Sequence, residues 1–334
     1  MKNKNTNILI TGITGFLGSL IAKNLIHTDA YRQGSIKIIG LARNIEKAQV
    51  QFADYDMRNV SFHSVDITDK DKMFSIFKEQ HIDYMIHCAA ATASSYMVSH
   101  PIETADGIVL GTRNMLELAR RMQVKSMVYL SSMEAYGRVT DIGRPRKEEE
   151  LGDIDITSPR SCYPLGKRMA EHYCHIYYKE YGVPVKVARL SQTFGEGVRP
   201  EDKRVFMQFA RSAMQYEDIV LKTQGLSVGN YCDSTDAVNA VMMLLHKGEN
   251  GEIYNVVNEE NTMTIRQMAQ LVSDRIAGGR IQVRVEAEDT TKTGYAPDTA
   301  LRMSAEKLRL LGWRPTKNLE QMYRDVIQEL EKSV

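Results

Sequence analysis

Tyr163 and Lys167 lie four residues apart in the segment Tyr163-Pro164-Leu165-Gly166-Lys167. Proline suits the first turn of a helix, and an i, i+4 spacing places both side chains on one helical face. A neighbouring ammonium group favours the phenolate and lowers the pKa of a tyrosine from about 10 toward neutral pH. Such a pair can pass a proton to or from a hydroxyl or carbonyl while a hydride moves to or from a nicotinamide.

The position of this pair matters more than its spacing. With sixteen tyrosines in the chain, about one Y-x-x-x-K match is expected by chance. This match follows the fifth predicted strand and opens a long predicted helix. Ser131 and Ser132 end that strand, at the sheet edge where doubly wound folds bind ligands. We therefore expect Ser132, Tyr163 and Lys167 to form one catalytic group.

A glycine-rich turn follows the first predicted strand, in Thr11-Gly12-Ile13-Thr14-Gly15-Phe16-Leu17-Gly18. The first glycine permits a tight turn, the second lets the backbone approach a pyrophosphate, and the third allows close packing of helix on strand. The start of the following helix offers free N–H groups. An ordinary strand-to-helix turn is the alternative. The setting favours dinucleotide binding by Gly12, Thr14, Gly15, Phe16, Leu17 and Gly18.

The ends of the next strands predict the rest of the cofactor site. The second strand ends in Gly40-Leu41-Ala42-Arg43, without the carboxylate that selects NAD. Arg43 favours NADP, unless its side chain only faces solvent. Asp66 and Ile67 follow the third strand and are expected beside the adenine, with helix capping as the rival role for Asp66. Ala89 and Ala90, next to His87, are expected to line the cofactor.

Short apolar runs alternate with helix-length amphipathic segments in the first half of the chain. This order predicts an α/β fold of the Rossmann type, a doubly wound parallel sheet with right-handed crossovers. The predicted strands are 7–11, 36–41, 60–65, 84–88, 126–131 and 185–190, followed by short strands near 219–222 and 252–256. The predicted helices are 16–27, 70–80, 104–122, 166–181, 264–276 and 319–332.

The alternation loosens after Leu190, which predicts two parts. Residues 1–190 are expected to form the dinucleotide-binding domain, with a returning segment near 227–258. Residues 191–226 and 259–334 are expected to form a smaller α+β substrate-binding lobe.

Composition excludes several classes of protein. The 43 basic and 42 acidic residues nearly cancel, which gives no global field for nucleic acid or an anionic membrane. The four cysteines show no C-x-x-C spacing, so neither a metal site nor a disulfide framework is expected. No run approaches the ~20 apolar residues of a membrane span, and no signal-peptide cleavage pattern follows the N-terminus. We expect a cytoplasmic protein that binds a small molecule.

Three motifs in order carry a family resemblance: T-G-x-x-G-x-x-G, S-S-x-x-x-Y-G and Y-P-x-x-K. They resemble the extended short-chain dehydrogenase/reductase family, and more closely its NAD-dependent epimerase/dehydratase group, which acts on nucleotide sugars. Leu311-Gly312-Trp313-Arg314-Pro315 resembles a late motif of that group. The resemblance implies that Ser132 polarises the reacting oxygen, that Tyr163 is the acid and base, and that Lys167 also binds the nicotinamide ribose. It further implies a homodimer through the helices at 104–122 and 166–181.

The chain departs from that group at several positions. Dehydratases place an Asp-Glu pair after the serine, whereas this chain has Met133-Glu134. Glu134 is either a retained base or only a hydrogen-bond acceptor. Gly229 and Tyr295 stand where two diphosphate-binding arginines are usual. Phosphate binding would then fall to Arg199, Lys203 and Arg204 in the predicted lobe, with solvated surface charge as the alternative, and Gln192 is a further candidate for substrate binding.

The family resemblance favours a nucleotide-sugar epimerase that oxidises and re-reduces one sugar carbon. The alternative is an NADPH-dependent reductase of a keto-sugar, sugar phosphate or related carbonyl compound, which Arg43 and the missing arginines favour. A non-catalytic dinucleotide sensor on the same fold is a third hypothesis, and the presence of Ser132, Tyr163 and Lys167 together counts against it. The sequence does not name the sugar or the nucleotide.

Overall fold

The computed structural model describes residues 5–139, 143–287 and 300–332. The chain divides into two compact units that each draw on separate stretches of sequence. Unit 1 takes its described residues from Met1–Gly137, Ile154–Arg189 and Val238–Tyr254. Unit 2 takes its described residues from Arg138–Asp153, Leu190–Ala237 and Asn255–Val334.

Unit 1 is built on a seven-stranded sheet. Its strands are β1 (Thr6–Thr11), β2 (Ile36–Ala42), β3 (Val60–Ser64), β4 (Tyr84–His87), β5 (Ser126–Ser132), β6 (Val185–Leu190) and β10 (Ile253–Val256). They lie in the order β10-β6-β5-β4-β1-β2-β3, and β1 pairs in parallel with both β2 and β4. The order reverses direction at β1 and β4, which is the kind of switch point where open α/β sheets bind ligands.

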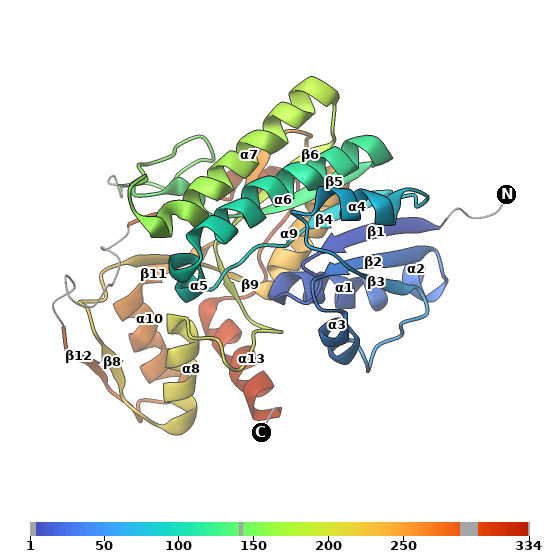
Figure 1. Cartoon of the computed structure of the whole chain (residues 1–334). Helices are drawn as coiled ribbons and strands as arrows, with labels where there is room; N and C mark the ends of the chain where they lie inside the picture. Colours follow the sequence, from blue (N-terminus) through green and yellow to red (C-terminus); the bar gives the residue numbers. More distant parts are fainter. Residues whose placement is uncertain (1–4, 140–142, 288–299, 333–334) are drawn as a thin grey trace. The chain divides into compact units, whose positions relative to one another are not determined.

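Helices cover both faces of this sheet (Figure 1). One face carries α4, α6 and α7, and the other carries α1, α3 and α9. The helices and 3₁₀ turns of this part are α1 (Phe16–Ile26), α2 (Asp29–Arg32), α3 (Ile45–Gln51), α4 (Lys70–Phe77), α5 (Ser94–Ser99), α6 (Pro101–Met122), η1 (Met133–Tyr136), η2 (Pro159–Ser161), α7 (Cys162–Tyr181) and α9 (Ser234–Lys247). The long helices α6 and α7 pack against each other.

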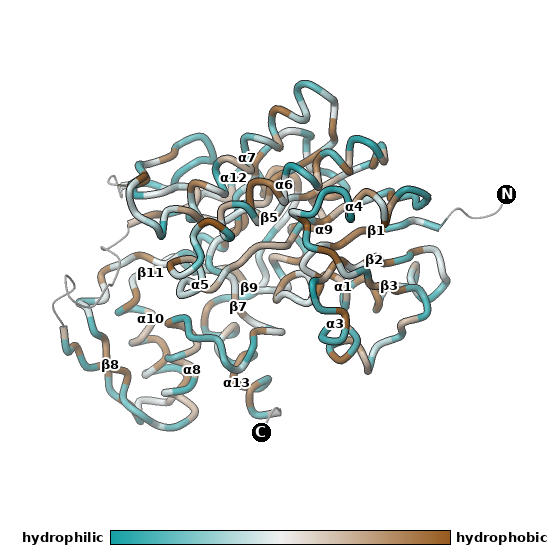
Figure 2. Tube along the Cα trace, viewed as in Figure 1, coloured by the Kyte–Doolittle hydropathy of each residue, from teal (hydrophilic) through white to brown (hydrophobic). Residues whose placement is uncertain are grey.

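The central strands are apolar along their length because helices cover them on both sides. Leu9, Met85 and Met127 come from three neighbouring strands and are fully buried in one core cluster. Figure 2 shows the same continuous apolar character along β1. The sheet is therefore rigid where its strands end, and the loops that follow those ends are held in place.

The predicted fold class is confirmed. The six strands predicted for the first half of the chain are all present, with ends that differ by at most one residue. Helix α7 begins at Cys162, four residues before the predicted start, because the 3₁₀ turn η2 leads directly into it. Helix α6 likewise begins at Pro101, since proline is suited to the first turn.

Unit 2 contains two small sheets. Strands β7 (Gln192–Phe194), β9 (Val228–Asp233) and β11 (Asn258–Thr264) form one, in which β9 is parallel to β7 and antiparallel to β11. Strands β8 (Ile219–Leu221) and β12 (Val283–Val285) form the other. Its helices are α8 (Val205–Gln215), α10 (Ile265–Leu271), the π-helical turn η3 (Val272–Ile276), α12 (Glu306–Leu310) and α13 (Leu319–Lys332).

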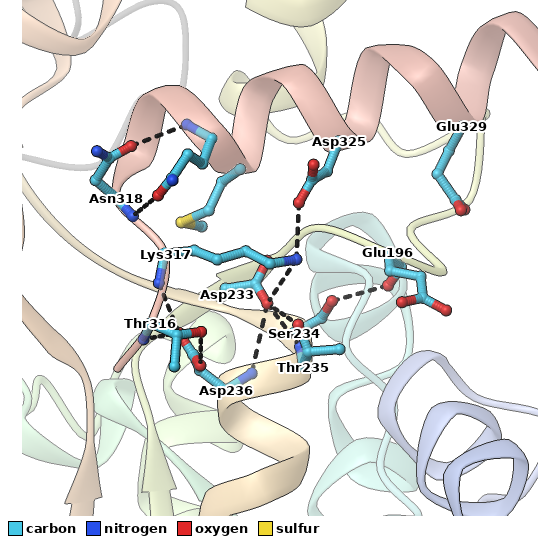
Figure 3. A network of polar contacts seen from close by, with 12 residues as sticks. Glu196, Asp233, Ser234, Thr235, Asp236, Thr316, Lys317, Asn318, Asp325 and Glu329 are labelled. Atoms are coloured by element: carbon cyan, nitrogen blue, oxygen red, sulfur yellow. Dashed lines mark hydrogen bonds and ion pairs between the residues drawn. The ribbon is translucent and has the colours of Figure 1, made fainter. Parts of the chain in front are cut away.

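A polar network fixes the start of α9 within unit 2 (Figure 3). Asp233 is fully buried, and its Oδ1 accepts a hydrogen bond from the backbone N–H of Thr235 at 2.9 Å. Lys317 Nζ lies 3.6 Å from Asp233 Oδ1 and 2.7 Å from Asp325 Oδ2. Asp236 accepts from the backbone N–H of Thr316 at 2.8 Å. The lysine thus neutralises a buried carboxylate and connects β9 and α9 to α13.

The borders of the units differ from the predicted domain borders. Residues 138–153 belong to unit 2 and not to the predicted domain 1–190, because Arg146 forms a β-bridge with Met303. The segment that returns to unit 1 is 238–254, whereas 227–258 was predicted. The difference arises because β9 pairs with β7 and β11 in a separate sheet.

Within the described residues, no helix is long and apolar enough to cross a bilayer.

Candidate active site

The glycine-rich turn between β1 and α1 has no room for side chains at Gly12, Gly15 or Gly18. Gly12 has φ +65°, and a Cβ atom there would lie 2.9 Å from the backbone of Ala89. A Cβ atom at Gly18 would lie 2.3 Å from the carbonyl oxygen of Gly12. Gly15 closes the turn by donating its N–H to Gly12 O at 2.8 Å. These contacts bring the backbone close to the start of α1, as a dinucleotide site requires.

The N-terminus of α1 is open to an anionic ligand. Its N-cap is Gly15, which has no side chain to accept from the first N–H groups, and the first turn contains no acidic residue. The unsatisfied N–H groups and the helix dipole therefore favour a phosphate group at this position. Thr14, Phe16 and Leu17 lie in the same turn and are partly exposed, as a binding role would need.

A buried histidine braces the neighbouring end of β4. Thr11 Oγ1 accepts the backbone N–H groups of Cys88 and Ala89, each at 3.1 Å. It also lies 2.7 Å from His87 Nδ1, and His87 Nε2 lies 3.2 Å from Thr112 Oγ1. Because two donors occupy the Thr11 oxygen, its own proton goes to Nδ1, so Nε2 carries the histidine proton.

His87 is consequently a neutral structural group. Burial, together with the nearby positive charge of Lys167, lowers the pKa of His87 to about 3. A ring that cannot become charged keeps both hydrogen bonds at every physiological pH. This arrangement fixes the backbone of Ala89, and Ala90 follows directly after it, so the loop after β4 is held beside the glycine turn.

Arg43 and Asp66 follow β2 and β3, as the sequence placed them. Arg43 is exposed, and its carbonyl oxygen accepts from Ser64 Oγ at 3.1 Å. Partial burial of Asp66 opposes ionisation, but hydrogen bonds from Thr68 and the charge of Arg43 outweigh it and lower the pKa of Asp66. The rival role of Asp66 as a helix cap is wrong, because Asp69 caps α4 by accepting from Lys72 N. Ile67 fills the space above Gly111 on α6.

Tyr163 and Lys167 meet at the start of α7. Lys167 Nζ lies 5.6 Å from the centre of the Tyr163 ring and 4.7 Å from that of Tyr129. It donates a 2.7 Å hydrogen bond to the carbonyl oxygen of Leu130 on β5. Tyr163 is 6% exposed and Lys167 3% exposed, so the ammonium charge acts in a site with little water. A cation stabilises a phenolate strongly in such surroundings.

The pKa of Lys167 lies close to neutral pH. Burial lowers the pKa of Lys167 to about 8, and the negative charge of Glu171 opposes that shift. Lys167 is therefore mostly charged at neutral pH and loses its proton under mildly alkaline conditions. A group that titrates close to neutral pH suits proton transfer.

Ser132 ends β5 and opens the 3₁₀ turn η1, which packs against α7. Its Oγ accepts the backbone N–H of Glu134 at 3.2 Å, so its own hydroxyl proton is available to a ligand. The Glu134 carboxylate accepts from Arg160 Nη2, at 2.9 Å for Oε1 and 2.8 Å for Oε2. Arg160 was not among the predicted site residues. It lies three residues before Tyr163, but an arginine there has no motif to mark it.

The NAD dependent epimerase/dehydratase family matches residues 8–257. The chain belongs to this family. The match spans the glycine turn, the end of β5 and the Tyr-Lys pair, so the resemblance inferred from these motifs is confirmed. The protein is an enzyme of the family, whose members include nucleotide-sugar epimerases, dehydratases and decarboxylases.

Relatives that match nearly the whole of this chain are named for different reactions. UDP-glucuronic acid decarboxylase 1 of Danio rerio is 30% identical over 330 residues, which cover 98% of this chain and 73% of that protein. dTDP-D-glucose 4,6-dehydratase of Bos taurus is 27% identical over 315 residues, which cover 92% of this chain and 84% of that protein. Because these relatives differ in activity, membership of the family does not by itself fix the reaction.

Solved structures agree with the fold. dTDP-glucose 4,6-dehydratase of Bacillus anthracis in complex with NAD superimposes with a TM-score of 0.78 at 25% identity, covering 98% of this chain and 97% of that one. UDP-glucose 4-epimerase of Thermotoga maritima with UDP-glucose gives 0.82 at 24% identity, covering 98% and 99%. The second comparison supports the fold alone.

The predicted substrate residues lie in unit 2, and their surroundings differ. Gln192 is the first residue of β7 and is partly exposed, and Arg199 is exposed. Arg204 is held by Asp202, with 2.6 Å between Nη2 and Oδ2, and its guanidinium lies over the ring of Phe206. Binding of phosphate by Arg204 would therefore compete with a carboxylate that already neutralises it.

Of the two positions where this family usually has a diphosphate-binding arginine, the structure describes only Gly229. A Cβ atom at Gly229 would lie 2.2 Å from the hydroxyl oxygen of Tyr231, so the phenol fills the space that a side chain at 229 would need. Tyr295 lies outside the described residues. Among the residues that the structure describes, no group of three His, Cys, Asp or Glu side chains is placed to hold a metal ion.

Proposed function

We propose that this enzyme oxidises and then re-reduces one hydroxyl-bearing carbon of a nucleotide sugar and inverts it, as an NAD(P)-dependent epimerase. The observation that carries this proposal is that Lys167 contacts both the ring of Tyr163 and the carbonyl oxygen of Leu130, two residues before Ser132, in a chain whose glycine turn leaves the start of α1 open. Together with Ser132, these side chains could remove a proton from a substrate hydroxyl while a nicotinamide accepts the hydride.

The chain provides a fitting site for the dinucleotide. Gly12, Gly15 and Gly18 leave room only for backbone, and the start of α1 would hold the pyrophosphate. Asp66, Ile67, Ala89 and Ala90 would line the adenosine and nicotinamide halves, and Lys167 would bind the nicotinamide ribose. When bound, the nicotinamide supplies the acceptor and donor of a hydride.

The chain's own residues handle the proton and the oxygen. The Tyr163 phenolate, stabilised by Lys167, accepts the proton of the sugar hydroxyl as that carbon is oxidised. Ser132 donates a hydrogen bond to the same oxygen, which holds the resulting carbonyl. Tyr163 returns the proton when the carbonyl is reduced on its opposite face, which inverts the carbon.

Two features bear on the choice among family reactions. Elimination of a hydroxyl needs an acid beside Glu134, and Met133 at that position has no proton to give. Decarboxylation is the second candidate, because a relative 30% identical over nearly the whole chain is a UDP-glucuronic acid decarboxylase. Oxidation of the hydroxyl-bearing carbon β to a carboxylate would give a β-keto acid, which loses CO₂ readily.

The alternative of an NADPH-dependent reductase rests on Arg43. Arg43 is exposed and follows β2, and in dinucleotide sites of this kind a residue near the end of the second strand reads the 2′ position of the adenosine ribose. We propose NADP as the preferred cofactor on this ground. A net reductase must exchange its cofactor in every turnover, whereas an epimerase regenerates it.

We further propose a homodimer in the cytoplasm. Exposed apolar residues on α6 and α7 support the dimer, with Ile102 72%, Leu110 42% and Met169 40% exposed. Free cysteines at positions 88, 162, 174 and 232 fit a reducing compartment. Light scattering after size-exclusion chromatography would measure the mass, and a monomer at micromolar concentration would contradict the dimer.

The experiment that tests the function begins with the cofactor. The purified protein is denatured and the released nucleotide is identified by mass spectrometry, and the intact enzyme is then incubated with UDP- and dTDP-sugars. We expect a bound dinucleotide and an epimerised sugar in the NMR spectrum of the products. A protein that is empty, and that consumes added NADPH in step with a carbonyl substrate, would favour the reductase. Release of CO₂ would favour the decarboxylase.

A further inference from the structure

The arginines around the candidate active site differ in how fully their donors are used. Arg168 donates to the carbonyl oxygens of Ala135 and Tyr136, at 2.6 and 2.9 Å. Arg189 donates through two nitrogens to the Glu171 carboxylate. Arg160 binds Glu134 through Nη2, but its Nη1 is shielded from water and has no acceptor among the described residues. A buried donor without a partner costs about 1–3 kcal/mol, so such a group calls for an explanation.

Arg160 lies at the reacting end of the site. Its guanidinium carbon is 5.7 Å from the centre of the Tyr163 ring, over the ring face. Its partner Glu134 follows Ser132 by two residues and donates its backbone N–H to Ser132 Oγ. The sugar carbon that reacts must lie at Tyr163 and Ser132. A substrate group within reach of Arg160 is therefore attached to the sugar ring and not to the nucleotide.

The charges around Tyr163 leave room for an anion. Glu134 and Arg160 neutralise each other, as do Glu171 and Arg189. His87 is neutral, and burial raises the pKa of the Cys88 thiol to about 12, so that group is neutral as well. Lys167 remains as a positive charge in these surroundings. While Tyr163 is protonated, this charge has no counter-charge in the set, and a substrate that carries one negative charge on its sugar would balance it.

We propose that Arg160 binds a carboxylate carried by the sugar ring, so that the substrates are nucleotide sugars of the uronic acid type. The inference rests on the proposed function and makes it more specific. A carboxylate matches the planar fork of a guanidinium group, which can hold Glu134 on one nitrogen and the substrate on the other. The Arg160 side chain is 32% exposed. Rotation about its terminal side-chain bonds can therefore bring the Nη1 atom to a ligand without any change in the backbone of the 3₁₀ turn Pro159–Ser161.

The test compares two ligands that differ at one carbon. UDP-glucuronic acid carries a carboxylate where UDP-glucose carries a hydroxymethyl group. Their dissociation constants are measured by calorimetry on the enzyme loaded with the dinucleotide that it binds, and their kcat/KM values are measured where turnover occurs. The variants are Arg160→Gln, Arg160→Lys and Glu134→Gln. The control is Arg58→Gln, which removes an exposed arginine paired with Asp56.

We expect the unmodified enzyme to bind UDP-glucuronic acid at least about tenfold more tightly than UDP-glucose. Arg160→Gln should weaken binding of the acid by about 10–100-fold, as loss of a charge-assisted hydrogen bond predicts, with about threefold or less for UDP-glucose. Arg160→Lys should restore part of the difference. Glu134→Gln should strengthen binding of the acid, because it frees the guanidinium. Arg58→Gln should leave both constants unchanged.

Three outcomes would overturn the inference. Equal losses for both ligands would show that Arg160 only positions Glu134. Equal or tighter binding of UDP-glucose by the unmodified enzyme would exclude a carboxylate site while leaving the proposed function intact. Failure to bind either ligand, or the corresponding dTDP-sugars, would exclude the proposed function together with the inference. Thermal unfolding of each variant verifies that a loss of binding does not reflect a loss of folding.

Discussion

Glu171 and Arg189 form a buried ion pair in which Arg189 Nη2 lies 2.6 Å from Glu171 Oε2 and Nε lies 3.0 Å from Oε1. Their side chains are 5% and 1% exposed. Ser131 adds a third hydrogen bond, from its Oγ to Glu171 Oε1 at 2.6 Å. The network thus connects α7, β5 and β6 through Ser131, which precedes Ser132, and Glu171, which follows Lys167 by four residues.

Removal of one partner should be costly. In Glu171→Ala the guanidinium of Arg189 stays buried without a counter-charge, and we expect the free energy of unfolding to fall by about 3–5 kcal/mol. Urea denaturation followed by circular dichroism measures the change. Glu117→Ala is the control, because Arg120 and Arg121 on the same helix are 41% and 48% exposed and such surface pairs contribute about 0–1 kcal/mol. Similar losses in both variants would contradict the assigned role of Glu171.

The sequence predicted those parts of the site that depend on local geometry. A strand, a glycine turn and a helix start are neighbours along the chain, and so are Tyr163 and Lys167. Their spacing alone decides which groups face one another. Ser132 was predicted as a third site residue because parallel strands end at a common edge of the sheet. In the structure, Lys167 donates a hydrogen bond to the carbonyl oxygen of Leu130, which lies on the same strand as Ser132.

The parts that were missed depend on contacts between distant residues. His87 and Thr11 are 76 positions apart, and Arg160 and Glu134 are 26 apart. No local period or motif links such residues, so only the folded chain shows that they meet. The unit borders differ from the predicted domain borders for the same reason, since Arg146 pairs with Met303 and β9 pairs with β7 and β11.

Tyr163→Phe tests the assigned proton transfer. The variant keeps the ring against Lys167 but lacks the hydroxyl, so kcat should fall by about 10²–10⁴-fold, the usual contribution of a general acid and base. The dissociation constant of the dinucleotide, measured by fluorescence titration, should change little because the glycine turn is untouched. An equal loss of turnover and cofactor affinity would show that Tyr163 holds the cofactor and does not carry the proton.

Lys186 should make the free energy of unfolding depend on pH in the alkaline range. It is 4% exposed, its Nζ donates to Ser126 Oγ at 2.8 Å, and burial lowers its pKa to about 8. Between about pH 8 and 10.5 the unfolded chain keeps this proton while the folded chain has lost it, so the free energy of unfolding rises with pH. Below pH 8 both states are protonated and the cost of burying the charge is constant.

Lys186→Met should remove this contribution. The rise in unfolding free energy from pH 7 to pH 10 should be smaller in the variant, by at most about 3 kcal/mol. Urea denaturation at both pH values measures it. Lys37→Met is a matched control, because Lys37 lies on β2 and is exposed. If the two variants show the same pH dependence as the unmodified protein, Lys186 does not titrate as its surroundings imply.

Arg43→Asp tests the choice of cofactor. Arg43 lies close enough to Asp66 to help lower the pKa of that carboxyl group, so the substitution would place two carboxylates together where the adenosine ribose is expected. Their charges repel a 2′-phosphate, while a carboxylate can accept from the 2′-hydroxyl of NAD. We expect the ratio of NADP to NAD affinity to fall by about 10–100-fold, the value of one charge-assisted hydrogen bond. Titration of both cofactors against the variant and against Arg43→Gln separates repulsion from loss of the guanidinium. An unchanged ratio in both variants would mean that Arg43 does not contact the 2′ position.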